Sequence, residues 1–270
     1  MPRSGTSLVT QLLHRCGLDL GPPDQLMPAS INNPDGYWEN LQFVRFNERL
    51  LAANGGTWFA PPAALTSTPE LAAEARSIVA QFQEPWGWKD PRNAVTLSFW
   101  RSILPSMKVL VCIRHPAQTA SSLVASTLMP RSWQLSWSVT RPDSPIRLRD
   151  RPSRFHQRLC GAIRTSMSVE NRRQLIYEVG LELWRVYNTK ILEETVPGDR
   201  LVTHYEAVLK NPYSELERIL NFAEIHASSA VIREAAQVVS PRLWHQRTAD
   251  AELNPELAML YAQLSNEAKS

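Results

Sequence analysis

Residues 108–123, KVLVCIRHPAQTASSL, contain the strand and the helix on which the prediction of the fold depends. The first part, 108–113, is nearly continuously apolar, as are the strands of parallel sheets that are buried on both faces. His115 and Pro116 then begin a helix that we expect to reach about residue 128, since proline is well tolerated in a first helical turn. A strand followed at once by a helix is the repeating unit of parallel α/β proteins.

The same alternation recurs along the chain. Strands are predicted over 86–89 and 200–204, and helices over 7–15, 40–53, 177–194 and 212–222, with shorter helices from Thr68 and over 206–209. The stretch 21–39 is too rich in proline, asparagine and glycine for regular structure. We therefore predict an α/β fold with a central parallel sheet and right-handed crossovers.

The composition is that of an ordinary globular protein. The 270 residues are 43% hydrophobic and 20% charged, which predicts a single domain over 1–270. The net charge of +3 suits an anionic ligand but is too small to indicate nucleic acid. Cys16, Cys112 and Cys160 are unclustered, so we expect a reducing compartment and neither disulfides nor a zinc site. The sequence has no run of about 18 apolar residues and no apolar signal-peptide core, so we expect a cytoplasmic protein without a membrane span.

A small, hydroxyl-rich turn, RSGTS, begins at Arg3 and leads into the first predicted helix. Gly5 allows the backbone to approach a ligand closely, while Ser4, Thr6 and Ser7 add hydroxyl donors. The helix behind the turn contributes free N–H groups and the positive end of its dipole. Arg3 can direct two N–H donors at phosphate or sulfate oxygens. The turn therefore predicts an anion-binding loop, although a plain capped helix start has the same residues.

A second anion site is predicted at the end of strand 108–113. The strand delivers Arg114 at its carboxyl end, where α/β sheets bind ligands, and Ser122 follows two turns into the next helix. A lone arginine there is commonly a surface ion pair, but an arginine and a hydroxyl beside an anion loop suggest a phosphate site. The GK[ST] pair of nucleoside triphosphatases is missing, so we expect a site without metal.

Together, PRSGTSL at 2–8 and IRHPAQTASSL at 113–123 resemble the nucleotide-binding motifs of sulfotransferases that use 3′-phosphoadenosine 5′-phosphosulfate (PAPS). VTHYEAVLKNP at 202–212 resembles that family's strand-then-tyrosine segment. The resemblance implies that residues from Arg3 to Leu8 bind the 5′-phosphosulfate and that Arg114 and Ser122 bind the 3′-phosphate. It also implies that Tyr205 lies against the nucleotide, whose spent form is 3′-phosphoadenosine 5′-phosphate (PAP). Cytosolic members carry lysine where this chain has Arg3, and the branch that the chain resembles is the bacterial or Golgi-like one.

The resemblance implies a P-loop-like three-layer α/β/α fold in which the anion loop follows a central strand. Only Met1 and Pro2 precede the loop here, so the first strand is missing or truncated. We expect that the sequence starts downstream of the natural first residue; the alternative is that another segment takes the place of that strand. A longer start could also carry a membrane anchor.

The implied reaction is in-line transfer of a sulfuryl group to a hydroxyl or amine of an acceptor. GYWEN at 36–40 resembles the glycine-aromatic-glutamate segment of bacterial and Golgi-like members, so Glu39 is the first candidate for the general base. Asp90 is the second candidate and His115 the third. Lys89 is a candidate ligand of the sulfuryl group, and Arg3 of the departing phosphate. Glu39 is also compatible with a charge at a helix start, and Asp90 with a pair to Arg92.

The acceptor is predicted only as a small molecule, glycan or peptide, and nucleic acid is not expected as a partner. The segment 129–173, arginine-dense from Arg141, predicts a lid or insertion, which is either a solvated surface or a surface that recruits an anionic acceptor. Two alternatives to a sulfotransferase stay open: a non-catalytic nucleotide-binding homologue and a P-loop kinase-like enzyme. The sequence does not predict the oligomeric state.

Overall fold

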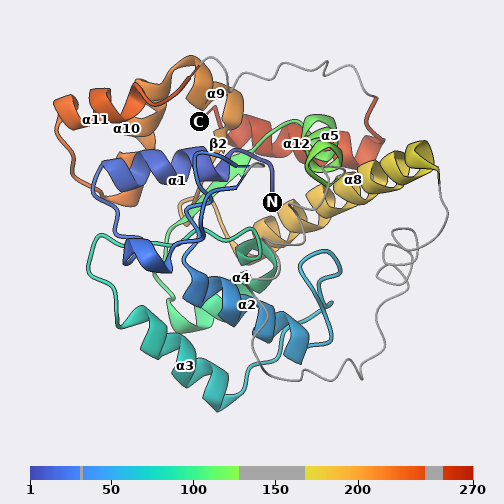
Figure 1. Cartoon of the computed structure of the whole chain (residues 1–270), viewed down its shortest axis with the longest axis horizontal. Helices are drawn as coiled ribbons and strands as arrows, with labels where there is room; N and C mark the ends of the chain where they lie inside the picture. Colours follow the sequence, from blue (N-terminus) through green and yellow to red (C-terminus); the bar gives the residue numbers. More distant parts are fainter. Residues whose placement is uncertain (31–32, 128–167, 241–251, 270) are drawn as a thin grey trace.

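The computed structural model describes residues 1–30, 33–127, 168–240 and 252–269 (Figure 1). In this part of the chain two strands, β1 (Val109–Ile113) and β2 (Arg200–His204), form a parallel sheet. Their register pairs Val109 with Arg200 and Ile113 with His204. Both strands were predicted, and the α/β class is confirmed. A larger central sheet, as a three-layer fold requires, is not seen among the described residues.

Helices account for most of the remaining described chain. They are α1 (Thr6–Arg15), α2 (Leu41–Ala53), α3 (Pro69–Val79), α4 (Asn93–Ile103), α5 (Pro116–Thr127), α8 (Val169–Glu194), α9 (Tyr205–Lys210), α10 (Pro212–Ala223), α11 (Ser229–Ala236) and α12 (Pro255–Glu267), with a short 3₁₀ turn at Pro23–Gln25. The helices α4, α11 and α12 were not predicted. The helix α8 begins well before the predicted residue 177 because Ser168 caps it and accepts a hydrogen bond from the backbone N–H of Asn171. Most of the predicted lid, 129–167, lies outside the described residues.

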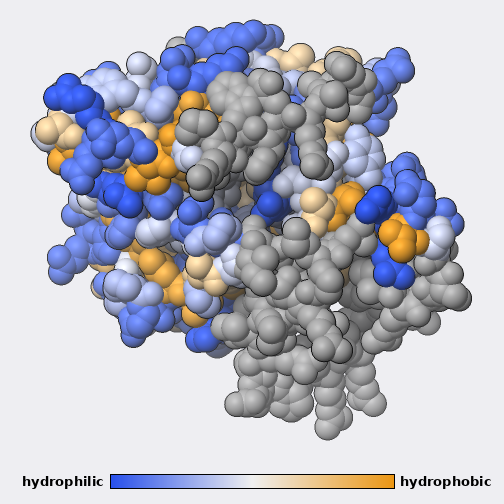
Figure 2. All heavy atoms as spheres, turned by 45° about the horizontal axis from the view of Figure 1, so that its top comes forward, coloured by the Kyte–Doolittle hydropathy of each residue, from blue (hydrophilic) through white to orange (hydrophobic). Residues whose placement is uncertain are grey.

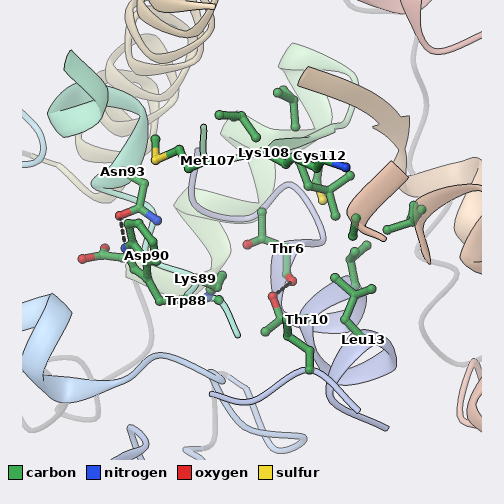
Figure 3. A pocket seen from close by; sticks show the side chains of 18 of the residues that line it. Thr6, Thr10, Leu13, Trp88, Lys89, Asp90, Asn93, Met107, Lys108 and Cys112 are labelled. Carbon is green, nitrogen blue, oxygen red and sulfur yellow. Dashed lines mark hydrogen bonds between the residues drawn. The ribbon is translucent and has the colours of Figure 1, made fainter. Parts of the chain in front are cut away.

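The prediction of a strand over 86–89 is wrong. The segment is extended but forms one isolated parallel bridge, between Asp19 and Trp86, and it does not pair with β1. Between it and β1 lies a cavity of about 570 Å³, which we call the edge cavity. Figure 3 shows Thr6, Thr10, Trp88 and Cys112 around it. A strand must form hydrogen bonds with a neighbouring strand. Among the described residues, the edge cavity lies where such a neighbour would be, between 86–89 and β1.

The two faces of the sheet are covered by different helices. Val111 and Ile113 point into a core shared with Leu183 and Trp184 of α8, while Cys112 points into a core shared with α1, α10 and α11. This alternation follows from the two-residue period of side chains along a strand. A third core, between α2, α3 and α4, is mainly aromatic and includes Trp100, which is fully buried and donates to Asn47 Oδ1 over 2.8 Å.

On the face shown in Figure 2, the coloured surface is mainly hydrophilic, with hydrophobic patches between the polar groups. None of the helices in the described ranges is long and apolar enough to cross a membrane.

Helix α5 packs closely against α8 at Gly180. A Cβ atom at residue 180 would lie 2.9 Å from the Cα of Ala120 and 3.0 Å from its Cβ. Because α5 also carries Ser122, a predicted phosphate ligand, this contact determines how far Ser122 lies from α8.

Replacing Gly180 by valine should destabilise the protein, since overpacking of this kind costs about 1–3 kcal/mol. The melting temperature should fall by several degrees, at about 2–4 °C per kcal/mol. Glu178→Val is the matched control, because Glu178 is exposed on the same helix and its replacement adds valine without overlap. Equal melting temperatures of the two variants would refute close packing of α5 on α8.

Candidate functional site

Two residues of the opening turn have a left-handed backbone, which glycine adopts more easily than any other residue. Gly5, the residue just before α1, has φ 88°. Arg3 is also left-handed, with φ 66°. A Cβ atom on Gly5 would overlap the ring of Tyr205, which directly follows β2. The backbone of the turn therefore lies directly on that ring. The two predicted motifs, far apart in sequence, are in contact.

Arg3 also reaches the motif that follows β1. Its Nε donates to Ser122 Oγ over 3.0 Å, between residues 119 positions apart. The Arg114 guanidinium lies over the ring of Tyr205, 5.0 Å from its centroid, and Arg114 Nε donates to Gln118 over 3.1 Å. Three predicted segments thus meet in one place.

A second group is centred on the ammonium of Lys89. Its Nζ donates to Ser7 Oγ over 3.2 Å, to the carbonyl of Tyr37 over 3.0 Å and to Glu39 Oε1 over 2.5 Å. An ammonium has three N–H donors, so each of them has an acceptor here. Both partners of the ion pair are largely buried, with side-chain exposures of 11% for Lys89 and 6% for Glu39.

Burial raises the pKa of Glu39 above its ordinary value, and the positive charge of Lys89 partly opposes that shift. The carboxyl is thus buried without losing its charge partner. A carboxylate held in this way is a stronger proton acceptor than one in water.

Asn33 and Tyr37 belong to the same group but were not predicted. Asn33 Nδ2 donates to Ser7 Oγ over 3.2 Å and to the carbonyl of Gly36 over 2.5 Å, so the segment before Glu39 is tied to the opening turn. The sequence NPDG at 33–36 is a strong turn signal, but nothing in it indicates which loop the turn contacts.

The other two candidates for the base lie elsewhere. The Asp90 side chain has no exposed surface; its Oδ1 accepts from Arg92 over 2.9 Å and its Oδ2 from Asn47 over 2.8 Å. Although burial opposes the charge of Arg92, Asp90 and Glu48 together raise its pKa. His115 packs edge-on against Tyr261, and burial lowers its pKa.

A single pocket of about 690 Å³, which we call the anion pocket, connects the two groups. Its lining includes Arg3, Gly5, Thr6, Ser7, Leu8, Glu39, Lys89, Arg114, Ser122 and Tyr205. Ser4, Asp90 and His115 are not part of the lining, and Ser4 Oγ is buried without a hydrogen bond to the described residues. Among the described lining residues, the cations Arg3, Lys89, Arg92 and Arg114 outnumber the carboxylates Asp35 and Glu39, which suits an anion. The described residues contain no group of three or more potential metal ligands.

Gly5→Ala should disrupt the contact between the opening turn and β2. The variant combines a left-handed backbone, which costs about 1–2 kcal/mol for alanine, with overlap on Tyr205. Gly17→Ala is the matched control: Gly17 has φ 104° but nothing within 4 Å of an added Cβ. The melting temperature should fall further for Gly5→Ala than for Gly17→Ala. Identical losses would mean that backbone strain alone acts and that the turn does not lie on the ring.

Comparison with known proteins agrees with this geometry. A family model described as the sulfotransferase family matches residues 1–229, which is most of the chain and includes every residue of the two groups above. No curated protein and no solved structure gives a significant match. The chain belongs to the sulfotransferase family.

Proposed function

We propose that this protein transfers a sulfuryl group from PAPS to a hydroxyl or amine of an acceptor. Family membership supports sulfotransfer in general. The observation that carries the finer proposal is the hydrogen bond from Arg3 to Ser122, which joins the two motifs predicted to bind anions within one pocket. A donor with phosphate groups at both its 5′ and 3′ positions needs two such sites close together.

The residues present fit PAPS. Arg114 and Ser122 would hold the 3′-phosphate, and Tyr205 would lie between that phosphate and the 5′ loop, since its ring contacts both Arg114 and the turn at Gly5. Arg3 and the backbone N–H groups at the start of α1 would hold the 5′-phosphosulfate. Leu8, Thr6 and Ser7 complete this wall of the pocket.

When bound, PAPS supplies an activated sulfuryl group on a phosphate leaving group. Glu39 takes the proton from the acceptor O–H or N–H while the acceptor oxygen or nitrogen bonds to sulfur and the bond from sulfur to the phosphate oxygen breaks. Arg3 would stabilise the negative charge that develops on the departing phosphate. As in phosphoryl transfer, the protein mainly positions the groups and balances charge.

Lys89 has two roles in this proposal. In the structure its three donors are occupied by Ser7, Tyr37 and Glu39, and its charge partly opposes the rise of the Glu39 pKa that burial causes. To contact the sulfuryl group it must exchange one of these acceptors, and the neutral hydroxyl of Ser7, at 3.2 Å, is the most distant of them. Asp90 is then a positioning residue: with Arg92 and Asn47 it fixes the backbone next to Lys89.

Calorimetric titration with PAP tests the donor site. The wild-type protein should bind PAP, and Arg114→Ala should bind it at least about tenfold more weakly, since a charge-assisted hydrogen bond is worth about 1.5–3 kcal/mol. Arg233→Ala, which removes an exposed arginine from α11, is the matched control and should bind PAP like the wild type. Absence of PAP binding to the wild type at millimolar concentration would overturn the proposal. Magnesium-dependent ATP binding instead would favour a kinase-like enzyme.

Glu39→Gln tests the base. The amide keeps the size and can accept a bond from Lys89 but cannot take a proton, so turnover of labelled PAPS with a reactive acceptor should fall by about 10²–10⁴-fold with PAP affinity nearly unchanged. Glu74→Gln, an exposed carboxylate that pairs with Arg49, is the control. The acceptor is first sought by screening phenols, sugars and peptides. PAP binding without turnover of any acceptor would favour a non-catalytic homologue.

The pH dependence gives an independent test of Glu39. The base acts only when ionised, and burial raises its pKa above the ordinary value, so kcat should fall as the pH drops through that raised pKa. The fall should begin at a higher pH than for a solvated glutamate, whose pKa is about 4.3. In Glu39→Gln this limb of the profile should be absent. A limb retained unchanged in the variant would assign the base to another residue.

A further inference from the structure

The helix α12 lies outside the 1–229 matched by the family model, yet it packs against β2 and α8 (Figure 1). Leu257 and Leu264 are buried in the core that contains Val111 and Val202. The helix is also held at its far end, where Arg200 at the start of β2 forms two hydrogen bonds of 2.8 Å to the Glu267 carboxylate. The docking of α12 therefore does not depend on a single contact.

Between these anchors, Tyr261 contacts three aromatic rings. His115 lies edge-on to it, with centroids 5.1 Å apart and an interplanar angle of 78°. Trp184 and His204 are each 6.0 Å away, at 71° and 89°. All three are edge-to-face contacts, the geometry that aromatic pairs prefer.

Each of these three rings belongs to a residue that is connected to Arg114 or Tyr205, either as its neighbour in the chain or by a hydrogen bond. His115 follows Arg114 in the chain, and His204 precedes Tyr205. Trp184 Nε1 donates over 3.0 Å to the carbonyl of Arg114. One side chain of α12 thus braces the backbone at the carboxyl ends of both strands, at the two residues whose side chains stack on each other.

We propose that Tyr261 is a positioning residue that holds Arg114 and Tyr205 in place for the 3′-phosphate. The inference rests on the proposed function, because it assumes that PAP is the ligand. Tyr261 itself is not part of the lining of the anion pocket. Its effect should fall mainly on ligands that carry a 3′-phosphate, since Arg114 is proposed to hold that group. The 5′ loop, by contrast, is also held through Ser7 by Asn33 and Lys89.

The test compares PAP with adenosine 5′-phosphosulfate, which lacks the 3′-phosphate. Tyr261→Ala should weaken PAP binding by roughly fivefold or more, as expected for the loss of aromatic pairs that order two residues of the site. Affinity for adenosine 5′-phosphosulfate should change by less than about twofold. In turnover, the KM for PAPS should rise while the KM for the acceptor stays constant. A general loss of structure would weaken both nucleotides and both substrates.

Two variants serve as controls. Tyr261→Phe retains the ring and should restore the PAP affinity of the wild type. Met259→Ala, at a side chain that is 73% exposed on the same helix, should have no effect. Wild-type PAP affinity in Tyr261→Ala would overturn the inference while leaving the proposed function intact, whereas a wild type that does not bind PAP would overturn both.

A second measurement needs no variant. If the docking of α12 strengthens PAP binding, PAP must by reciprocity strengthen the docking of α12. Amide hydrogen exchange in 255–267 of the wild type should therefore slow at least severalfold when PAP is added, while adenosine 5′-phosphosulfate should produce a smaller effect. Unchanged exchange in α12 at saturating PAP would refute the coupling even where Tyr261→Ala fails to fold.

Discussion

The site depends on the absence of a side chain at residue 5. Because Gly5 is left-handed and bare, the backbone of the opening turn rests on the ring of Tyr205, and no other residue type fits both conditions. This contact sets the start of α1 against the end of β2. From there Arg3 reaches Ser122 on α5. A steric constraint at one position thus brings together residues from three separate segments.

The electrostatics of the pocket follow from burial. A carboxylate and an ammonium removed from water lose hydration, and their pairing offsets that loss only when the remaining donors are also satisfied. Lys89 meets this condition through Ser7 and the carbonyl of Tyr37, so the buried pair with Glu39 is stable while the carboxyl retains a raised pKa. The same network holds the Glu39 carboxyl at the lining of the anion pocket.

The strand ends and the opening turn could be predicted from the sequence because their signals are local. The apolar run of β1 and the hydroxyl-rich turn can each be recognised from a few consecutive residues. The pairing of Glu39 with Lys89 joins residues 50 positions apart and has no local signal beyond the motif around Glu39. The expected strand over 86–89 shows the converse limit: its composition is that of a strand, but pairing depends on a neighbour that composition cannot supply. The burial of Asp90, and its bonds to Arg92 and Asn47, could likewise be seen only in three dimensions.

The register of the sheet carries the geometry of the fold into the site. Ile113 pairs with His204, so the next residues, Arg114 and Tyr205, leave the sheet side by side. Adjacent strands lie about 4.8 Å apart, which explains why the guanidinium comes to lie over the ring. A slip of one residue would turn Cys112 toward the core shared with α8 and Val111 toward the opposite core. The packing of both cores would then be disturbed. The register of β1 therefore does more than bury side chains: it determines which residue of β1 stands beside Tyr205, and with it where Arg114 lies.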